Sequence, residues 1–214
     1  MKKGKIIVLC ILLMINVLFM NTVIAEESVV GGDTIEECVS KMYGYYYEED
    51  EMEGTFQLVC STETFEHYDV DNYGIYPWVS GNTSSGFNVT IGTCIVSLPS
   101  EIKALEKIIF LTDKNRYIIT PKEPWGKGEN GFAVVMNDDF WAILEDVATS
   151  ETTKVRFSED KSDDHYDLEM SQDQKKMIAN VVYINKHFVP ESNALAKALV
   201  QGNAINYTIV RSDR

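Results

Sequence analysis

Hydrophobic residues recur at helical spacing in several parts of the chain. One such segment begins near residue 33, and a second begins at Asn137, a residue that commonly caps helices. A third begins at the capping box formed by Ser171 and Gln174. Because apolar residues at a period of 3.6 line one face of a helix, the pattern predicts helices at 33–48, 137–149 and 171–188, with a further helical segment at 191–200.

Alternating or β-branched runs mark the strands. The clearest form two hairpins, one around the turn at 113–115 and one around 160–165. The stretch 62–86 contains Pro77 and several glycines, which predicts a long loop with room for one short strand. The predicted strands are 55–61, 87–98, 107–112, 116–120, 132–136, 154–159, 166–170 and 204–210. Hairpins interleaved with helices predict a compact single α+β domain, a mostly antiparallel sheet with two or three packed helices.

The first 25 residues have the pattern of a secretory signal peptide. Three lysines precede an almost wholly apolar stretch at 6–20, and Ala25 offers a small residue at a cleavage site. The alternative is an uncleaved anchor, which needs about 20 apolar residues. Because this apolar core is shorter, we expect a signal peptide at 1–25 and one exported domain at 26–214. The mature chain is then secreted or periplasmic and has no membrane span.

Acidic residues outnumber basic ones, 33 to 19, which gives the 214-residue chain a net charge of −14. Removing 1–25 takes away three lysines and no acid, so the mature chain carries −17. Nucleic-acid backbones bind clustered Lys and Arg, so this balance argues against DNA or RNA as a partner. Hydrophobic residues make up 45% of the chain and aromatic residues 11%, too many for a disordered acidic protein.

The mature chain has three cysteines, Cys38, Cys60 and Cys94. Export favours a disulfide, and three cysteines allow three single bridges. The predicted helix at 33–48 and the predicted strand at 55–61 both turn a cysteine toward their apolar side, so we expect the pair Cys38–Cys60. Cys94 is then a small buried residue or, alternatively, an intermolecular or reactive thiol. Its sequence neighbours do not resemble the cationic surroundings that activate a thiolate.

Few residues form a pattern with recognisable chemistry. The three histidines have no regular spacing and no Cys-x-x-Cys occurs, so we predict no metal or cofactor site. The densest group of metal-capable side chains is Asp163-Asp164-His165-Tyr166-Asp167, near a predicted hairpin tip. Such a tip can gather carboxylates and an imidazole around a cation, but aspartates also favour solvated turns, which we prefer here. No nucleophile, base and orienting acid can be recognised together, so we assign no catalytic residue.

Several large aromatic residues fall in the predicted loops. Tyr76, Trp78 and Trp125 form our candidate contact surface, because exposed aromatics stack on sugar rings or anchor protein interfaces. The alternative is that they fold back over the core, as large aromatics commonly do. Tyr43 and the tyrosines at 45–47 fall on the helix predicted at 33–48, where some of them must face solvent, so this run is a further candidate contact surface.

Residues 106–188 combine several features in a fixed order. The Lys/Asp hairpin, 111–117, precedes the amphipathic helix, and a Lys-Val-Arg-Phe strand at 154–157 and Tyr-Asp-Leu at 166–168 precede the capped helix with Tyr183. In this order the segment resembles small exported bacterial proteins of uncharacterised function, although Glu159 stands where a glycine is common. The resemblance implies export and the fold, and it implies no activity, cofactor or partner.

Two functions follow from these observations. The first is an exported, non-catalytic module that binds an envelope or extracellular protein or glycan, and its support is export, compact size and loop aromatics. The alternative is a secreted acid-dependent hydrolase of glycan or peptide, supported by the abundance of acids and the cluster at 163–167. Acids that converge in a pocket with shifted pKa values would favour the hydrolase, and a convex, solvated tip would count against it.

Overall fold

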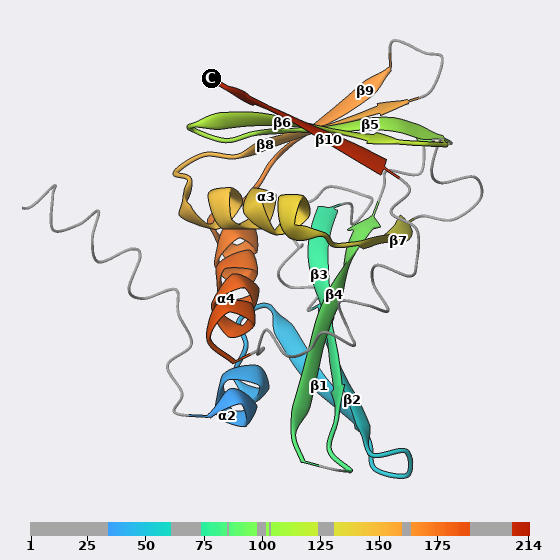
Figure 1. The fold of residues 1–214 in the computed structure, drawn as a ribbon, viewed down its shortest axis with the longest axis vertical. Coiled ribbons are helices and arrows are strands. Elements are labelled where there is room, and N and C mark those ends of the chain that lie inside the picture. Colours follow the sequence, from blue (N-terminus) through green and yellow to red (C-terminus); the bar gives the residue numbers. More distant parts are fainter. Residues whose placement is uncertain are drawn as a thin grey trace, which may run out of the picture.

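The computed structural model describes most of the chain beyond residue 33 (Figure 1). The described residues are 34–60, 74–84, 86–97, 102, 104–123, 131–159, 164–188 and 207–214, without the side chains of Cys60, Asn88 and 131–133. The predicted signal peptide, Trp125 and the predicted helix at 191–200 lie outside them. The helices are α2 (Ile35–Ser40), α3 (Asp138–Thr149) and α4 (Gln172–Phe188). The strands are β1 (Tyr45–Asp50), β2 (Thr55–Cys60), β3 (Gly74–Asn82), β4 (Asn88–Ser97), β5 (Leu105–Leu111), β6 (Asn115–Pro121), β7 (Gly131–Val135), β8 (Lys154–Glu159), β9 (His165–Glu169) and β10 (Tyr207–Asp213).

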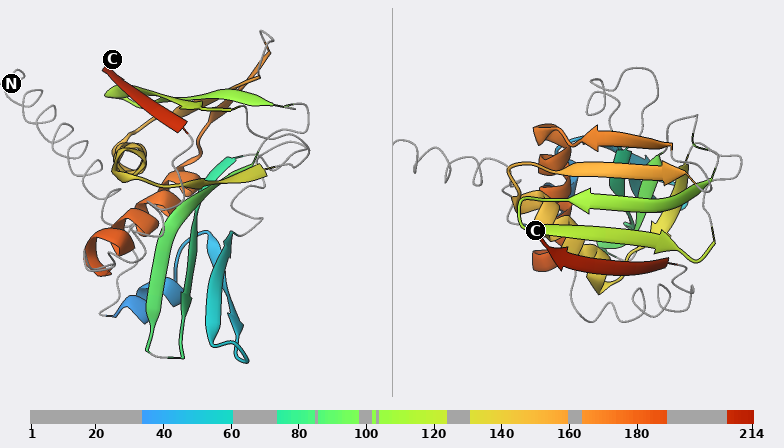
Figure 2. Two further views of the ribbon diagram at one scale, coloured as in Figure 1. Left: turned by 45° about the vertical axis from the view of Figure 1, so that its right-hand side comes forward. Right: turned by 90° about the horizontal axis from the view of Figure 1, so that it is seen from above.

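The strands form two five-stranded sheets in which all neighbours are antiparallel. The N-terminal sheet has the order β1-β2-β3-β4-β7, and the C-terminal sheet has the order β10-β6-β5-β8-β9. Helix α3 lies under the C-terminal sheet, and α4 runs below α3 beside the N-terminal sheet (Figures 1 and 2). This arrangement confirms the predicted α+β fold with antiparallel sheets and packed helices. Among the described residues, none of the helices combines the length and apolar character needed to cross a membrane.

Local signals explain why α3 and α4 begin where they do. The side chain of Asn137 accepts a hydrogen bond of 2.9 Å from the backbone N–H of Phe140 and so caps α3. In the capping box before α4, the N–H of Gln174 donates to Ser171 Oγ at 3.2 Å. The N–H of Ser171 donates back to Gln174 Oε1 at 3.1 Å. Both predicted helix starts are therefore confirmed.

Alternation along the strands of the C-terminal sheet builds its half of the core. Phe110 of β5 faces Val155 of β8, and Ile108 faces Phe157. All four side chains are at most 1% exposed. They point toward α3, so this face of the sheet and the apolar stripes of α3 and α4 enclose one continuous core. Both hairpins predicted for this sheet are confirmed.

The prediction of one helix over 33–48 is wrong. Helix α2 ends at Ser40, and the tyrosine run belongs to β1. Gly44 has φ of 79°, a left-handed conformation that ends helical geometry before the tyrosines begin. Tyrosine favours strands, and β1 gains a full partner in β2, with which it pairs from Tyr45 opposite Cys60 to Asp50 opposite Thr55. The helical spacing of the tyrosines was therefore coincidental.

The region predicted as a long loop over 62–86 contains a nine-residue strand, β3. Strand β3 pairs with β4 along most of its length and with β2 from Leu58 opposite Val79 to Thr55 opposite Asn82. Pro77 lies beyond the end of the β2 pairing, so its missing N–H removes no ladder hydrogen bond on that side. The proline that contributed to the loop prediction is thus accommodated where pairing is incomplete, whereas Gly81 is paired on both sides, with Phe56 and with Val89.

Replacing Gly54 with alanine should destabilise the turn between β1 and β2 by about 1–2 kcal/mol. Gly54 has φ of +62°, and an added Cβ would lie 2.8 Å from Cβ of Ser84. Urea denaturation of G54A would measure the loss, with Met52→Ala as the matched control because Met52, in the same turn, is 95% exposed. Equal midpoints for the two variants would contradict the expected clash.

Candidate functional site

A groove of about 500 Å³ crosses β1, β2 and β3 near the tip of the N-terminal sheet. It is lined by Glu48, Glu49, Asp50, Thr55, Phe56, Gln57, Ser80 and Gly81. Strand pairing aligns Glu48, Gln57 and Ser80 in one row across the three strands, and Asp50 with Thr55 in the next. Paired residues point to the same face, here the face opposite the buried side chains of the sheet.

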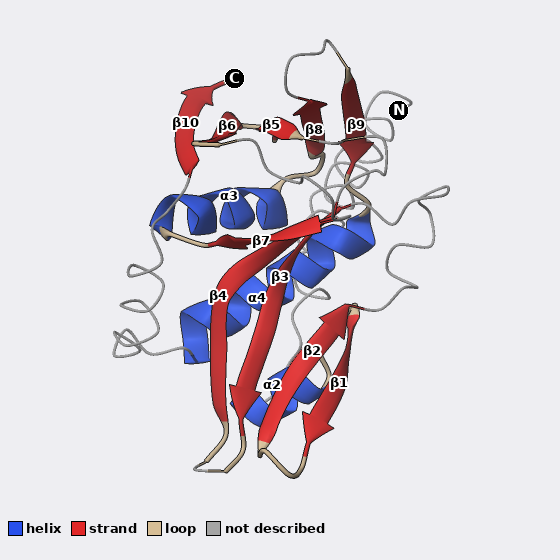
Figure 3. Ribbon diagram, turned by 90° about the vertical axis from the view of Figure 1, so that its right-hand side faces the viewer, coloured by secondary structure: helices blue, strands red, loops and turns tan. Residues whose placement is uncertain are grey.

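This outer face is turned away from the helices. Phe56 and Leu58 of β2 are at most 3% exposed and point to the other side of the sheet, into the core. Figure 3 shows the strands of the N-terminal sheet in front and α2 and α4 behind them. The rows that contain Glu48 and Asp50 therefore lie on a surface that none of the described helices covers, whereas Glu49 and Phe56, which are paired with each other, belong to the opposite face.

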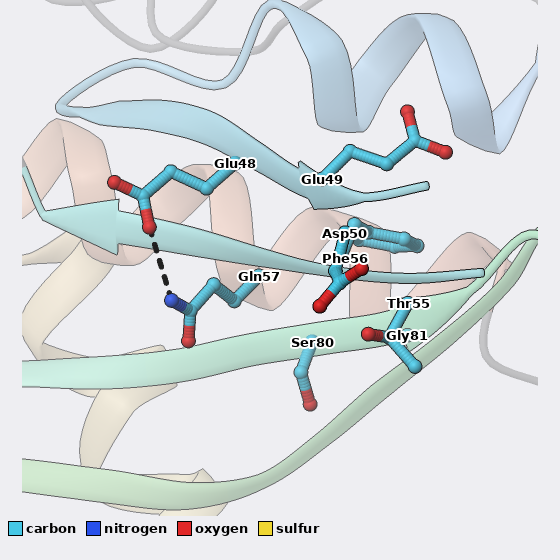
Figure 4. A pocket seen from close by; sticks show the side chains of 8 residues that line it. All are labelled: Glu48, Glu49, Asp50, Thr55, Phe56, Gln57, Ser80 and Gly81. Atoms are coloured by element: carbon cyan, nitrogen blue, oxygen red, sulfur yellow. Dashed lines mark hydrogen bonds between the residues drawn. The ribbon is translucent and has the colours of Figure 1, made fainter. Parts of the chain in front are cut away.

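Two carboxylates face the groove, and each has a defined local contact. Gln57 Nε2 donates to Glu48 Oε2 at 3.0 Å across the β1–β2 pair (Figure 4). Asp50 Oδ1 accepts the backbone N–H groups of Met52 at 3.0 Å and Glu53 at 3.1 Å, which holds the hairpin turn. Glu48 thus presents an exposed, oriented carboxylate, and Asp50 adds a second negative charge beside it.

Glu49 extends in a different direction from Glu48 (Figure 4). Its carboxylate accepts hydrogen bonds from Thr83 Oγ1 at 3.1 Å and from the hydroxyl of Tyr47 at 3.3 Å. Tyr47 in turn stacks on Phe56, with ring centroids 5.2 Å apart. Glu49 therefore stabilises the hairpin and adds to the negative potential, while none of the residues that line the groove is Lys or Arg.

Aromatic side chains flank the groove on the same face. Tyr46 precedes Glu48 by two residues on β1 and is 49% exposed. Trp78 precedes Ser80 by two residues on β3 and is partly exposed. Partial burial raises the pKa of Tyr46, and repulsion from the Glu48 carboxylate raises it further, so this hydroxyl stays a donor at neutral pH. The acidic groove and these rings form one surface.

The structure brings together part of the predicted contact surface. Tyr76 and Trp78 lie two residues apart on one face of β3, although Tyr76 also packs against the core. Trp125 is outside the described residues. Tyr46 belongs to the tyrosine run that we also considered as a contact surface, but we assigned that run to a helix. Three consecutive tyrosines after Gly44 favour a strand, and this is the signal that could have placed Tyr46 correctly.

The aspartate–histidine group at 163–167 does not converge on a described pocket. Asp163 lies outside the described residues, and Asp164, His165 and Asp167 are exposed at or on the edge strand β9. Asp167 accepts two hydrogen bonds of 2.6 Å from Arg156, and these lower its pKa. Within the described parts of the chain, no three His, Cys, Asp or Glu side chains are grouped to hold a metal ion. Asp167 is thus held as an ionised partner of Arg156.

The described cysteines are structural. Cys38 in α2 and Cys94 in β4 are fully buried, and no disulfide is present between the cysteine side chains that the structure describes. The Cys60 side chain lies outside the described set, so the pair Cys38–Cys60 stays a prediction. Burial raises the pKa of the Cys94 thiol far above its ordinary value, which keeps it protonated and a poor nucleophile.

A second polar cluster, which the sequence did not indicate, surrounds Asp146 on α3. Its Oδ2 accepts hydrogen bonds from Thr112 Oγ1 at 2.6 Å, Asn115 Nδ2 at 2.8 Å and the Tyr117 hydroxyl at 3.1 Å. Burial alone would raise the pKa of Asp146, but these three donors outweigh it and the net shift is downward. Burial and the neighbouring carboxylate raise the pKa of Tyr117 to about 12.

A neighbouring set of contacts joins the β5–β6 turn to the loop that follows α3. Asp113 accepts from the hydroxyl of Thr152 at 2.7 Å and from the backbone N–H groups of Glu151 and Thr152. The hydrogen bond from the Thr152 hydroxyl is the main cause that lowers the pKa of Asp113. Because its donors and acceptors satisfy one another, we interpret this junction as a structural clamp rather than a ligand site.

Acid should destabilise the fold through Asp113, Asp146 and Asp167. The pKa of each is lower in the folded protein than the ordinary 3.8, so the unfolded chain binds protons first as pH falls. Their stabilisation is complete above pH 3.8 and is lost as pH drops through the lower folded values. Urea midpoints measured from about pH 6 down to about pH 2.5 should therefore fall steeply below about pH 4. A constant midpoint over this range would contradict the prediction.

Comparison with known proteins adds no assignment to this geometry. No protein-family model, no curated protein and no solved structure matches the chain. The resemblance of residues 106–188 to small exported bacterial proteins therefore stays a prediction. The functional hypothesis rests on the groove and on the aromatic side chains beside it.

Proposed function

We propose that this protein is an exported, non-catalytic binding module that recognises a basic segment of another protein at the outer groove of the N-terminal sheet. One observation carries the proposal: Glu48 and Asp50 face an open groove of about 500 Å³ among whose lining residues no basic side chain occurs. A Lys or Arg side chain would gain opposite charge there. The net charge of −14 extends the attraction beyond contact distance.

The aromatic neighbours suit the same partner. Lys and Arg place their charged heads over aromatic faces and lay their aliphatic stems on apolar surface. Tyr46, at 49% exposed, and Trp78 lie directly beside the acidic rows. The groove therefore supports recognition by charge at Glu48 and Asp50 and by packing at the rings.

The hydrolase alternative has weaker support from the same residues. A general acid must be held protonated near working pH, and a nucleophile or base must be free to reach substrate. Oδ1 of Asp50 accepts backbone N–H groups of the turn, and Oε2 of Glu48 accepts from Gln57. These contacts hold both carboxylates against the sheet, which suits attraction of a cation better than proton transfer to a substrate.

A peptide-binding measurement tests the proposal. Fluorescence anisotropy of a labelled Lys/Gly peptide should show saturable binding, and a Glu/Gly peptide of the same length should show none. Glu48→Gln combined with Asp50→Asn should weaken binding by about 5- to 10-fold, since each exposed charge pair contributes up to about 1 kcal/mol. Both substitutions keep a hydrogen-bonding oxygen, so the turn and the contact to Gln57 survive.

Glu106→Gln is the matched control, because Glu106 is an exposed acid on the C-terminal sheet, remote from the groove. It should leave the affinity for the Lys/Gly peptide unchanged. Equal losses in the control and in the groove variant would show that net charge alone drives binding. If the protein binds a neutral oligosaccharide and does not discriminate between the two peptides, the ligand of the groove is a glycan and not a basic protein segment.

A further inference from the structure

Strand β10 forms one edge of the C-terminal sheet. It pairs with β6 along its whole length, from Tyr207 opposite Pro121 to Asp213 opposite Asn115. Seen from above, β10 closes one side of the sheet and β9 the other (Figure 2). In the part of the chain that the structure describes, β6 is the one strand paired with β10, so alternate backbone N–H and C=O groups of β10 point outward.

The two edges of this sheet differ in how they resist further pairing. On β9, Asp167 pairs with Arg156 at 2.6 Å and Glu169 pairs with Lys154 at 3.7 Å. Charges on an edge strand discourage association with another strand. On β10, the residues on the same outer face are Thr208, Val210 and Ser212. These three are uncharged, so β10 lacks the protection that β9 has.

An apolar row crosses β5, β6 and β10 on the outer face of the sheet and ends at this unprotected edge. Strand register places Val210 of β10 beside Ile118 of β6, and Ile118 beside Ile109 of β5. Val210 is 59% exposed, one of few large hydrophobic side chains among the described residues with that much exposure. Charged side chains of β10 lie on the opposite face, where Arg211 donates to Asn115 Oδ1 at 3.1 Å.

We propose that β10 pairs antiparallel with β10 of a second copy of this chain, which joins two C-terminal sheets into one ten-stranded sheet around a two-fold axis. In a register centred on Val210, each Val210 meets the other and Thr208 meets Ser212. Ile209 then faces Arg211, and Tyr207 faces Asp213, so no like charges oppose one another. The apolar row continues through the axis and doubles in length.

The strand's own sequence favours a second copy over a different partner. Around a two-fold axis, residues of the two β10 strands that point to the same face of the sheet lie opposite one another. The outward backbone groups of one β10 therefore meet those of the other. A register centred on Arg211 would oppose two guanidinium groups, and one centred on Ser212 would shorten the paired segment to a few residues. Centring on Val210 avoids both costs and covers the most exposed apolar residue of the strand.

Cysteine cross-linking of the full chain tests the register. Under mild oxidation, Val210→Cys should give a covalent dimer, because opposed residues have Cα atoms about 4.5–5.5 Å apart. Thr208→Cys and Ser212→Cys should each form no covalent dimer, since each cysteine would lie roughly 13 Å from its own copy at about 3.3 Å per residue. The double variant T208C/S212C should cross-link again. The unchanged protein under the same oxidant controls for its own cysteines.

Molar mass by light scattering provides the second test. The unchanged protein should show twice the monomer mass, and Val210→Lys should shift it toward the monomer, because the substitution places two ammonium groups opposite one another at the axis. Glu169→Lys, on the other edge of the sheet, is the matched control and should remain dimeric. A monomer at all concentrations, a dimer that V210K leaves intact, or cross-linking by T208C alone would each overturn the proposal.

Discussion

Replacing Asp146 with alanine is expected to lower the free energy of unfolding by about 3–5 kcal/mol. The carboxylate accepts hydrogen bonds from Thr112, Asn115 and Tyr117, all of which are at most 5% exposed. Alanine would leave these three donors without their shared acceptor, and a buried unsatisfied donor costs about 1–3 kcal/mol. The loss is large because one oxygen holds the β5–β6 hairpin against α3.

Urea denaturation at neutral pH would measure this effect. Glu145→Ala is the matched control, because Glu145 precedes Asp146 on the same helix and pairs with Lys186 at 3.0 Å on the surface. Exposed pairs contribute up to about 1 kcal/mol, so the control should lose no more than that. If D146A is no less stable than E145A, the cluster does not stabilise the fold as described.

Lys175→Met should lower the free energy of unfolding by about 2–3 kcal/mol. Lys175 lies on α4 and is 4% exposed, and its ammonium group donates to the backbone carbonyls of Ser150 and Glu151 just after α3. Burial lowers the pKa of Lys175, and the carboxylates of Asp113 and Glu169 oppose that shift. Methionine keeps the apolar stem and removes the donor, so the two carbonyls lose their partner.

The neighbouring lysine provides the control for this prediction. Lys176 is partly exposed and holds its ammonium group 5.6 Å from the centre of the Tyr43 ring, a contact with a contribution of about 0.5–1 kcal/mol. Lys176→Met should therefore cost less than K175M by at least about 1 kcal/mol. Equal urea midpoints for the two variants would show that the buried ammonium group contributes nothing specific.

Elements with strong local signals were predictable from sequence. Asn137 and the pair Ser171 and Gln174 make the same capping contacts in the structure that their residue types imply. The hairpin strands of the C-terminal sheet alternate cleanly because one face is buried against helices and the other is open. In these elements, short-range chemistry and burial favour the same structure.

The two errors arose where long-range pairing outweighs local pattern. Tyr45 becomes a strand residue because Cys60 lies opposite it, and Pro77 becomes one because Cys94 does. Neither partner is near in sequence, so no short window contains the information. The same limit applies to the groove, since Glu48, Gln57 and Ser80 become neighbours only through the register of three strands.

The candidate site was therefore predictable only in part. Tyr76 and Trp78 could be selected as contact residues from residue type and local composition, and the structure places both on one face of β3. The acidic run that begins at Glu48 was visible as a charge cluster, but its meeting with those aromatics required the β2 strand between them. Asp146 gave no signal, because a single acid on an amphipathic helix resembles a solvated one.

The most direct test of the proposed function is a charge swap at the groove. Glu48→Lys should weaken binding of the Lys/Gly peptide by at least about 10-fold, measured by anisotropy at low salt, because it replaces an attracting charge in the groove with a repelling one. The affinity of the unchanged protein for this peptide should fall as salt is raised, because the attraction is electrostatic. Glu106→Lys on the other sheet changes net charge equally and should leave both peptides as they were. Unchanged preference for the Lys/Gly peptide in E48K would contradict recognition at this groove.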